Sequence, residues 1–452
     1  MGGMMAAGGA WLWRRARGCL LAGFWLLVLM LASVPAVADD VAVKIGNPLL
    51  AKFPVGGDAR PRSIWDLQVF NDKLYLAHGD YWNNAGPIDV WTYQGDGTNF
   101  VKEYTTQEEM IWDFFVQDDL LFIPGVDSVE ESPIRANIYV QDPQNGPGGG
   151  WTRRATLTGG VHSYDVALFQ NRLFTSMTME NQQARTLVST DMGASWSVLL
   201  QQYSAPIPFA DFLFLQGPTN YVYDGSQLTA VTPQLHVSQL SMARRVRVGD
   251  GLLYAYPVRY LLTPTPLYYM TAAQIQASGA ANQLMAFAGT CVRDILAHDG
   301  LCYVMTAETN TTSTFRGRIY ASADLTHWWQ ASEFSVPGVP LSFELYRNRF
   351  YVGLGSLFTG NWDKLVGPEA GSIWRIQPAA VEMAWVPAKE GVGGSMTVLG
   401  AAGLTLTVEA TSSLQDPQWE VIGTVQSASG IADLVDPDAA AHEARYYRVI
   451  LE

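Results

Sequence analysis

The chain has 452 residues, of which 48% are hydrophobic and only 15% are charged. This composition excludes a disordered chain, and the length allows two or more hydrophobic cores. The formal net charge of −14 disfavours nucleic acid and anionic lipid as partners, because both are negatively charged themselves.

The first 38 residues have the three parts of a signal peptide. Three arginines lie between positions 14 and 17, an apolar segment covers residues 20–31, and Ala36-Val37-Ala38 forms a small-residue cleavage site. Removing these three of the 28 basic residues leaves 25 against 42 acidic ones, a net charge of −17. Cleavage near Ala38 predicts a secreted, periplasmic or cell-surface protein without a membrane span, and an uncleaved anchor is the alternative.

Seven later segments follow one ten-residue template, with apolar second and fourth positions, a turn at the sixth and seventh, and usually an aromatic tenth residue. They are residues 66–75 (DLQVFNDKLY), 113–122 (DFFVQDDLLF), 165–174 (DVALFQNRLF), 211–220 (DFLFLQGPTN), 245–254 (RVRVGDGLLY), 294–303 (DILAHDGLCY) and 342–351 (SFELYRNRFY). Alternation of period two around a short turn predicts a β-hairpin in each. Successive segments begin 34 to 52 residues apart, which is near the length of a propeller blade.

The repeats predict an all-β chain with a seven-bladed β-propeller at residues 39–377. Third strands are expected in five units, at residues 88–93, 137–140, 187–189, 318–322 and 372–376. The segment at residues 41–45 has no hairpin partner nearby, so we expect it to complete the last blade. Closing the ring in this way removes exposed strand edges.

After Ile376 the composition changes, and the prolines, glycines and small residues of segment 378–394 predict a linker. Short alternating strands follow at residues 395–399, 404–410, 419–423, 431–435 and 446–451, and they predict a small β-sandwich at residues 395–452. The series LTVEATSSLQDPQWEVIG, LVDPDAA and RYYRVIL resembles a C-terminal module of large secreted bacterial proteins. That resemblance covers only the tail and implies display or adhesion.

The mature chain keeps two cysteines, Cys291 and Cys302, and such a pair in a secreted protein invites a disulfide. Cys302 is predicted to lie opposite Ala297 in a hairpin. Cys291 is then about 20 Å from that position along an extended strand, whereas a disulfide needs Cα atoms within about 7 Å. We therefore expect two buried free thiols.

The octet STDMGASW at residues 189–196 resembles the Asp-box, or BNR repeat, of sialidases and related propellers, through Ser189, Asp191, Gly193 and Trp196. A second copy at residues 322–329 has Thr326 in place of the glycine. In that family the motif is a structural hairpin at the outer edge of a blade, so it implies a propeller and not catalysis. A sialidase would also need three arginines that converge on a carboxylate, and no matching arginine motif occurs near the N-terminus.

The first template positions are expected to form one ring near the central channel: Asp66, Asp113, Asp165, Asp211, Arg245, Asp294 and Ser342. Carboxylates about 7 Å apart would repel by roughly 2 kcal/mol per pair at an effective dielectric constant of about 20. Compensation can come from Arg245, backbone amides, water or a bound cation such as Ca²⁺. We favour amides as the main partners, with an ion or ligand site as the alternative, and expect no other cofactor.

A long loop at residues 79–87, GDYWNNAGP, is the predicted glycan contact. Tyr81 and Trp82 can stack on sugar rings, and Asn83 and Asn84 can bond to hydroxyls. An aromatic plug between blades is the alternative. None of the six histidines has another at metal-ligand spacing, and His162 is expected to be a satisfied loop residue.

Together these features favour an exported, non-catalytic binding or surface-interaction protein, with an extracellular glycan or a surface protein as its partner. A sialidase-like glycoside hydrolase or a polysaccharide lyase is the first alternative, because channel carboxylates could act as acid and base. A structural envelope protein is the second. The fold alone does not decide, since propellers host both binding and catalysis.

Overall fold

The computed structural model describes residues 40–451 apart from 96, 131–135, 145–149, 258–260, 312, 348, 359–366, 378–381, 387–393, 400–403, 414–417, 428–430 and 442–444. The predicted signal peptide, including its cleavage site, lies outside the described residues. Within the described part of the chain, no helix is both long and apolar enough to cross a membrane.

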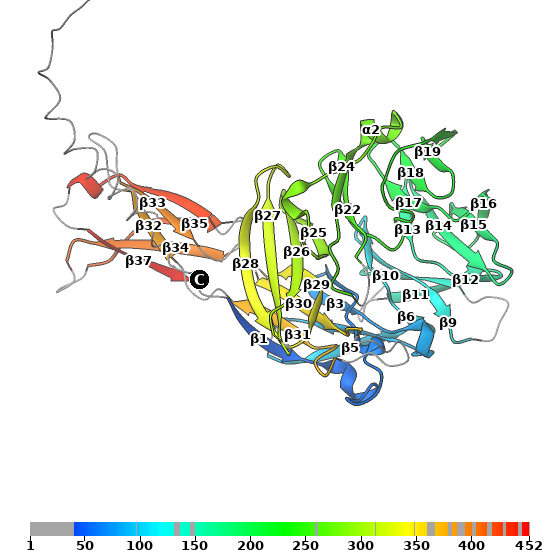
Figure 1. The fold of residues 1–452 in the computed structure, drawn as a ribbon, viewed down its shortest axis with the longest axis horizontal. Coiled ribbons are helices and arrows are strands. Elements are labelled where there is room, and N and C mark those ends of the chain that lie inside the picture. Colours follow the sequence, from blue (N-terminus) through cyan, green and yellow to red (C-terminus); the bar gives the residue numbers. More distant parts are fainter. Residues whose placement is uncertain are drawn as a thin grey trace, which may run out of the picture. The chain divides into compact units, whose positions relative to one another are not determined.

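Seven antiparallel sheets follow one another along the described residues of segment 41–377 (Figure 1). Blades 1 to 7 consist, from the inner strand outward, of β2 (Asp66–Phe70), β3 (Lys73–Ala77), β4 (Asp89–Tyr93) and β5 (Phe100–Thr105); β7 (Phe115–Gln117), β8 (Leu120–Pro124), β10 (Ala136–Asp142) and β11 (Gly150–Leu157); β13 (Val166–Phe169), β14 (Arg172–Met179), β15 (Ala184–Ser189) and β16 (Ser197–Leu200); β17 (Ala205–Pro208), β18 (Leu213–Gln216), β19 (Asn220–Tyr223) and β20 (Leu228–Val231); β21 (Arg244–Val248), β22 (Gly251–Ala255), β23 (Leu267–Thr271) and β24 (Asn282–Gln283); β25 (Val292–His298), β26 (Leu301–Thr309), β27 (Phe315–Ser322) and β28 (Trp329–Val336); and β29 (Val339–Tyr346), β30 (Arg349–Gly355), β31 (Ile373–Gln377) and β1 (Val41–Gly46).

Blade 3 is extended by three short strands, β12 (Gly160–His162), β9 (Val126–Ser128) and β6 (Glu108–Met110), which pair in that order beyond β14. The helices among the described residues are short: η1 (Pro48–Ala51), η2 (Arg60–Arg62), η3 (Tyr81–Asn83), α2 (Ala272–Gln276), η4 (Met285–Phe287) and η5 (Ala439–Ala441). The protein is therefore all-β, as the alternating pattern predicts.

The seven sheets close into a ring, which confirms the predicted seven-bladed propeller. Inner strands of neighbouring blades contact each other, as β2 does with β29, β29 with β25, and β25 with β21. The ring is completed by β1, which pairs antiparallel with β31 so that Val41 lies opposite Gln377. Figure 1 shows β1 in blue beside β31 in orange. The prediction that the segment at residues 41–45 completes the last blade is confirmed.

The inner hairpins turn where the template predicts. Positive φ angles occur at the sixth and seventh positions of four blades, at Asn71-Asp72, Asp118-Asp119, Gln170-Asn171 and Asp299-Gly300. A two-residue loop with both residues in the left-handed region continues the right-handed twist of the flanking strands. The turn residues thus set the register of each inner strand against the next.

Blade 4 departs from the template. Its inner strand is β17, which pairs with β18 across a four-residue loop, so the segment at residues 211–220 supplies the second and third strands instead of the first and second. Asp211 lies exposed in that loop. The prediction that Asp211 belongs to the channel ring is therefore wrong, because a longer loop shifted the hairpin by one strand.

Blade 5 is displaced from the template by one residue. Arg244 lies opposite Ala255 in its hairpin, just as Asp66 lies opposite Ala77 in blade 1. Arg244 is therefore the residue equivalent to Asp66, and Arg245 is not. A repeat matched by eye cannot separate two adjacent arginines unless the turn is placed correctly.

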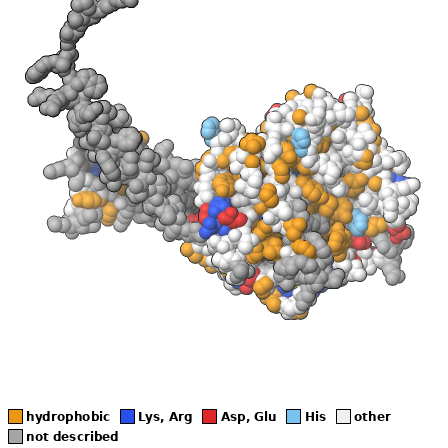
Figure 2. Space-filling view, in the orientation of Figure 1, with side chains coloured by type: hydrophobic (Ala, Val, Ile, Leu, Met, Phe, Trp, Pro, Cys, Tyr) orange, Lys and Arg blue, Asp and Glu red, His pale blue; other side chains and the backbone are white. Residues whose placement is uncertain are grey.

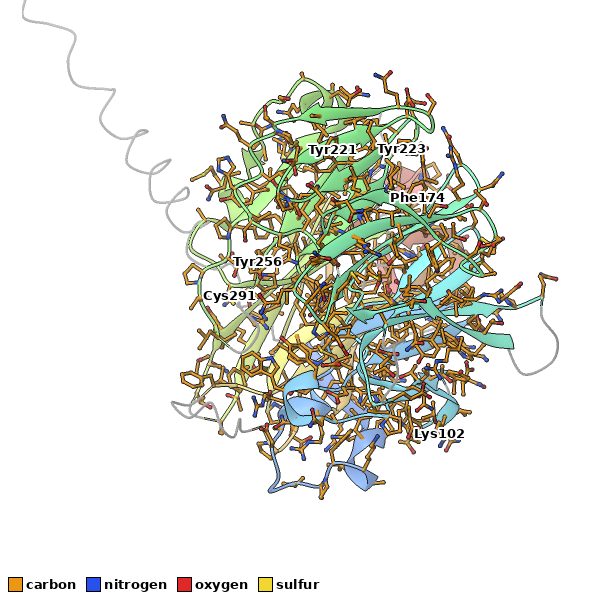
Figure 3. The ribbon with its side chains drawn as sticks, turned by 90° about the vertical axis from the view of Figure 1, so that its right-hand side faces the viewer. Lys102, Phe174, Tyr221, Tyr223, Tyr256 and Cys291 are labelled. Carbon is orange, nitrogen blue, oxygen red and sulfur yellow. The ribbon has the colours of Figure 1, made fainter. Side chains whose placement is uncertain are left out.

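The blades pack through aromatic and aliphatic side chains at their interfaces. Between blades 3 and 4, the rings of Phe174 and Tyr223 lie 5.8 Å apart, and the guanidinium of Arg172 donates to the Tyr223 hydroxyl at 2.8 Å. Figure 3 shows Tyr221 and Tyr223 close to Phe174. The face drawn in Figure 2 carries many hydrophobic side chains and few charged ones, in keeping with the low charged fraction.

Both cysteines are buried and free, as predicted. Cys302 lies opposite Ala297 in the β25–β26 hairpin, which is the position that the sequence indicated. Burial raises the pKa of the Cys302 thiol to about 12, so this thiol stays protonated and acts as a small apolar side chain.

The C-terminal residues form two three-stranded sheets that contact each other: β32 (Glu382–Val386), β33 (Gly394–Leu399) and β36 (Ile431–Asp436), and β35 (Glu420–Ser427), β34 (Leu404–Thr411) and β37 (Tyr446–Leu451). This arrangement confirms a small β-sandwich. The expected linker at 378–394 is corrected, because β32 lies within it and pairs with β33. Met383 and Trp385 alternate with other residues there, and the surrounding prolines and glycines masked that short strand pattern.

Candidate functional sites

The central channel contains a cavity of about 310 Å³. Its walls are the inner strands of several blades, and they supply both acidic and basic side chains: Asp66, Asp113, Asp294, Glu344, Arg244, Arg245 and Arg247. Four of the predicted ring residues therefore line this cavity, namely Asp66, Asp113, Arg245 and Asp294. Asp165 lies just outside it and reaches the ring through Arg245.

Arg244 lies among three of the ring aspartates, and we call Arg244, Asp66, Asp113 and Asp294 the Arg244 cluster. Its guanidinium nitrogens are 3.8 Å from Asp66 Oδ1, 3.8 Å from Asp113 Oδ1 and 3.5 Å from Asp294 Oδ1. The guanidinium also lies 5.4 Å from the ring centre of Trp112, as expected for a cation–π contact. One cation thus compensates three carboxyls at the start of the inner strands.

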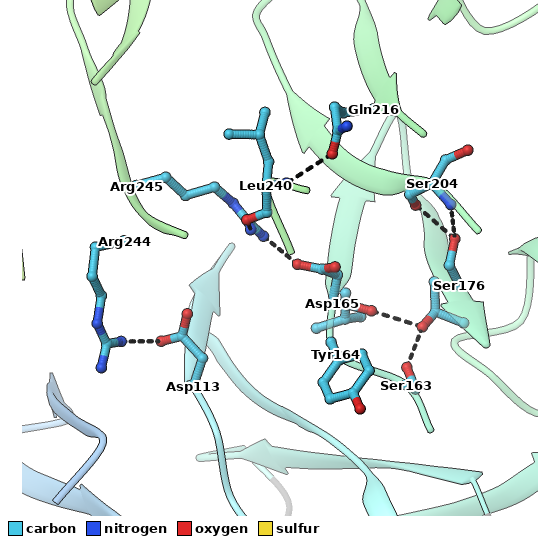
Figure 4. Close-up of polar contacts among 12 residues, drawn as sticks. Asp113, Ser163, Tyr164, Asp165, Ser176, Ser204, Gln216, Leu240, Arg244 and Arg245 are labelled. Carbon is cyan, nitrogen blue, oxygen red and sulfur yellow. Dashed lines mark hydrogen bonds and ion pairs between the residues drawn. The ribbon is translucent and has the colours of Figure 1, made fainter. Parts of the chain in front are cut away.

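The neighbouring Arg245 forms a second ion pair, with Asp165. Its guanidinium donates to Asp165 Oδ1 and to the Leu240 carbonyl, while the Tyr203 hydroxyl donates to Asp165 Oδ2 at 3.0 Å. Figure 4 shows Arg245 directed at Asp165 and Arg244 at Asp113. Because Asp165 is fully buried, these partners replace the water that its carboxylate loses on folding.

Backbone amides of the next blade also bind the ring carboxyls. Asp66 Oδ2 accepts from the Phe114 amide at 3.0 Å, and Asp294 Oδ2 accepts from the Phe343 amide at 2.9 Å. In both cases the donor follows the first template position of the adjacent blade. The ring carboxyls therefore connect neighbouring blades, which agrees with the favoured expectation of amide capping.

Burial changes the protonation of these acids. It raises the pKa of Asp66 well above its usual value, Asp113 raises it further, and Arg244 opposes the rise. Burial also raises the pKa of Asp294 to about 6 and that of Glu344 to about 8. For Arg244, burial lowers the pKa, but the three carboxylates outweigh burial and raise it overall.

The acid pair in the Arg244 cluster is too close for glycoside hydrolysis. The protonated carboxyl of Asp66 hydrogen-bonds to Asp113, so the two groups share a proton. The two catalytic carboxyls of a typical glycosidase lie about 5 Å apart or more, because the sugar or a water molecule reacts between them. This geometry counts against an acid–base role for the pair on a sugar.

Sequence reasoning missed Arg244, Trp65 and Trp112. The rings of Trp65 and Trp112 lie 5.5 Å apart beside the channel, and the Trp65 indole donates to the Gly79 carbonyl at 2.8 Å. A signal was present, because Ile-Trp-Asp occurs twice, at residues 64–66 and 111–113. The repeat indicates that blades 1 and 2 share their approach to the channel.

The loop at residues 79–87 is held in one shape by its own polar side chains. Asp80 Oδ1 accepts from the Asn83 amide at 3.0 Å, and Asn83 Oδ1 accepts from Arg60 at 3.2 Å. Trp82 nevertheless keeps 62% of its surface exposed, and Tyr81 is half-buried. Asn83 is used inside the loop, whereas Asn84 is exposed and adopts a left-handed conformation at its end, with φ of 48°.

A row of aromatic rings leads from this loop to the channel ring. Tyr81 lies 5.9 Å from His162, His162 lies 5.6 Å from Tyr164 in a stacked arrangement, and Tyr164 lies 6.3 Å from Tyr203. Tyr203 in turn donates to Asp165. The predicted loop and the predicted ring are thus joined by one continuous set of contacts.

Three acidic side chains lie side by side next to the same loop, and with His162 we call them the Glu109 cluster. The register of β6 with β9 places Glu109 opposite Asp127, and a bridge between Gly79 and Met110 places Asp80 on the other side of Glu109. Directly opposed acids repel by roughly 3 kcal/mol per pair at about 5 Å and an effective dielectric constant of about 20. The cluster was not predicted, although Glu108-Glu109 beside the apolar Met110-Ile111-Trp112 is an unusual sequence.

Glu109 is the buried member of this cluster. It is only 7% exposed, and its Oε2 has no hydrogen-bond partner among the described residues. Burial raises the pKa of Glu109 to about 7, and Asp127 and Asp80 raise it further. Asp127 has a φ of 62°, a left-handed conformation that is uncommon outside glycine and often marks functional sites.

No family model matches the chain, and no curated protein matches it. Among solved structures, PorZ, a surface component of the type-IX secretion system of Porphyromonas gingivalis, is similar at 10% identity over 88% of this chain and 60% of that chain, with a TM-score of 0.47. The propeller domain of the Trilobed protease from Pyrococcus furiosus is similar at 9% identity over 64% of this chain and 90% of that one, with a TM-score of 0.40. A putative 6-phosphogluconolactonase from Bacteroides uniformis is similar at 9% identity over 80% and 99% of the two chains, with a TM-score of 0.42. The chain thus spans 60% of the length of PorZ, and these likenesses concern the fold alone.

Proposed function

We propose that this chain is an exported, non-catalytic binding module that takes an extracellular glycan at the loop of Tyr81 and Trp82. The observation that carries the proposal is the large exposed surface of Trp82 on a loop fixed by Asp80, Asn83 and Arg60. An aromatic side chain held in place before binding loses little conformational entropy on contact with a ligand. Its apolar face suits the apolar face of a sugar ring.

The Arg244 cluster supports the non-catalytic part of this proposal. Its carboxyls are occupied by a guanidinium and by amides of the next blade, and these contacts join the blades. A general acid or base needs a free position from which to reach its substrate. We assign these residues to the scaffold of the ring.

The turn at residues 189–196 supports membership in the Asp-box class of propeller turns. Ser189 Oγ accepts from the Gly193 amide at 2.8 Å, Asp191 Oδ1 accepts from the Ser195 amide at 2.8 Å, and Gly193 has a φ of 84°. Trp196 fixes the turn by donating to Thr156 at 2.9 Å. In the second copy, Ser322 Oγ accepts from Leu325 instead, one residue earlier, in keeping with Thr326 at the glycine position.

The test is glycan-array binding of the mature chain and of Trp82→Ala, followed by calorimetry on the best ligand. We expect Trp82→Ala to weaken binding by roughly tenfold or more, in line with stacked aromatic anchors at other interfaces. Its melting temperature should match that of the parent, because the side chain is mostly exposed. A matched control is Trp329→Ala, which alters a tryptophan of the turn in blade 6.

Two results would contradict the proposal. One is the absence of any glycan ligand for the parent protein, and the other is equal affinity of Trp82→Ala and the parent. Release of reducing sugar by the parent, lost in Asp113→Asn, would instead favour the hydrolase alternative.

A further inference from the structure

Glu109 lies buried next to the exposed aromatic loop without a cation to balance it. Its Oε2 has no hydrogen-bond partner, and no Lys or Arg of the described chain forms an ion pair with it. On either side it faces Asp127 and Asp80. A carboxyl in this position loses its hydration and gains only like-charged neighbours.

The aromatic residues around the cluster are arranged to receive a cation. Tyr81 lies 5.9 Å from His162, and Trp82 lies 6.0 Å from Tyr81. The faces of such rings attract ammonium groups through their quadrupole. His162 contributes no positive charge near neutral pH, because burial lowers its pKa, although the charge of Asp127 opposes this effect.

We propose that the Glu109 cluster binds the protonated amine of an amino-sugar glycan whose ring stacks on Trp82. The inference rests on the proposed glycan site and specifies its ligand. An ammonium group carries three donors, so it can satisfy Glu109 Oε2 and the carboxylate of Asp127 together. The net charge of −17 expected for the mature chain also draws cationic ligands toward the protein.

The ring stacking is what favours a glycan over a basic peptide. Lysine brings an ammonium group on a flexible chain, whereas an amino sugar brings the same group on a rigid ring beside an apolar face. Trp82 and Glu109 then recognise two features of one sugar unit. Loss of either residue should therefore weaken the same ligand.

The test compares two six-unit oligosaccharides, one of glucosamine and one of N-acetylglucosamine, by calorimetry with the full mature chain at pH 6. We expect Glu109→Gln to weaken the glucosamine ligand by roughly tenfold, the effect of losing one charge-assisted hydrogen bond, and to leave the acetylated ligand unchanged. Asp127→Asn is a second variant at a half-buried position, which keeps the test valid if Glu109→Gln does not fold.

The matched control is Glu308→Gln, which removes the same charge from an exposed acid of blade 6 that pairs with Arg318. It should not change either affinity, and a loss equal to that of Glu109→Gln would reduce the effect to general charge attraction and overturn the inference. Equal binding of both oligosaccharides, unaffected by Glu109→Gln, would also overturn it while leaving the glycan proposal intact. If neither oligosaccharide nor any array glycan binds the parent, the glycan proposal itself fails. Equal binding of a six-residue lysine peptide that is independent of Trp82 would assign the cluster to peptides instead.

Discussion

The Arg244 cluster and the Glu109 cluster are both groups of buried carboxyls in the propeller, but only the first contains its own counter-charge. Around Arg244, three aspartates share a guanidinium and accept amides from the adjacent blades. Around Glu109, three acids face one another, and Oε2 of the most enclosed carboxyl lacks a hydrogen-bond partner. The comparison teaches that compensated acids hold this fold together, while uncompensated ones leave an interaction for a ligand to supply.

The largest effect should come from removing the compensation in the channel. Arg244→Met would leave Asp66, Asp113 and Asp294 without their cation, and we expect a loss of about 3–5 kcal/mol in the free energy of unfolding. Denaturant titration measures this loss. The control is Arg347→Met, which breaks an exposed ion pair with Asp72 between blades 7 and 1 and should change the midpoint little. Similar midpoints for the two variants would end the distinction between scaffold and ligand site.

A smaller effect is expected at Glu108, the neighbour of Glu109. Glu108 is fully buried, and burial raises its pKa to about 8 from an ordinary value of 4.5, although hydrogen bonds from Asn137 and Tyr139 lower it. The folded state therefore holds a proton that the unfolded state releases as the pH rises from about 4.5 to about 8. Stability should fall over this window by up to about 1.4 kcal/mol per pH unit from this residue.

Glu108→Gln should remove that part of the slope and make the protein more stable than the parent at pH 8. Thermal melts across the pH range measure the difference. The control is Glu130→Gln, because Glu130 is exposed and its pKa is lowered by a hydrogen bond from Arg153. A slope that persists in Glu108→Gln would show that other groups cause it.

The smallest effect should be that of a chelator on the channel. Because Arg244 supplies positive charge among the ring aspartates, we expect EDTA and added Ca²⁺ to leave the melting temperature unchanged. A stabilisation by Ca²⁺ that disappears in Asp113→Asn would place an ion in the ring beside Arg244. That result would make the two clusters more alike than the comparison holds.

The fold was predictable because every blade repeats one local pattern. Alternation and turn residues such as Asn71-Asp72 specify a hairpin without reference to distant residues. Asp211 and Arg245 were misplaced for the same reason, since a four-residue loop in blade 4 and a one-residue offset in blade 5 change the register that the pattern assumes. Glu109 could not be assigned, because its surroundings arise from the pairing of β6 with β9 and not from its neighbours in sequence.

The pairing of β1 with β31 has a consequence for how the molecule is made. During synthesis, residues 41–46 emerge first, but their partner at residues 373–377 emerges only after the other six blades. Until then both strands present open edges that could join a second chain, and contacts so distant in sequence form slowly. Assembly of this protein should therefore be most vulnerable to aggregation just before its two ends meet.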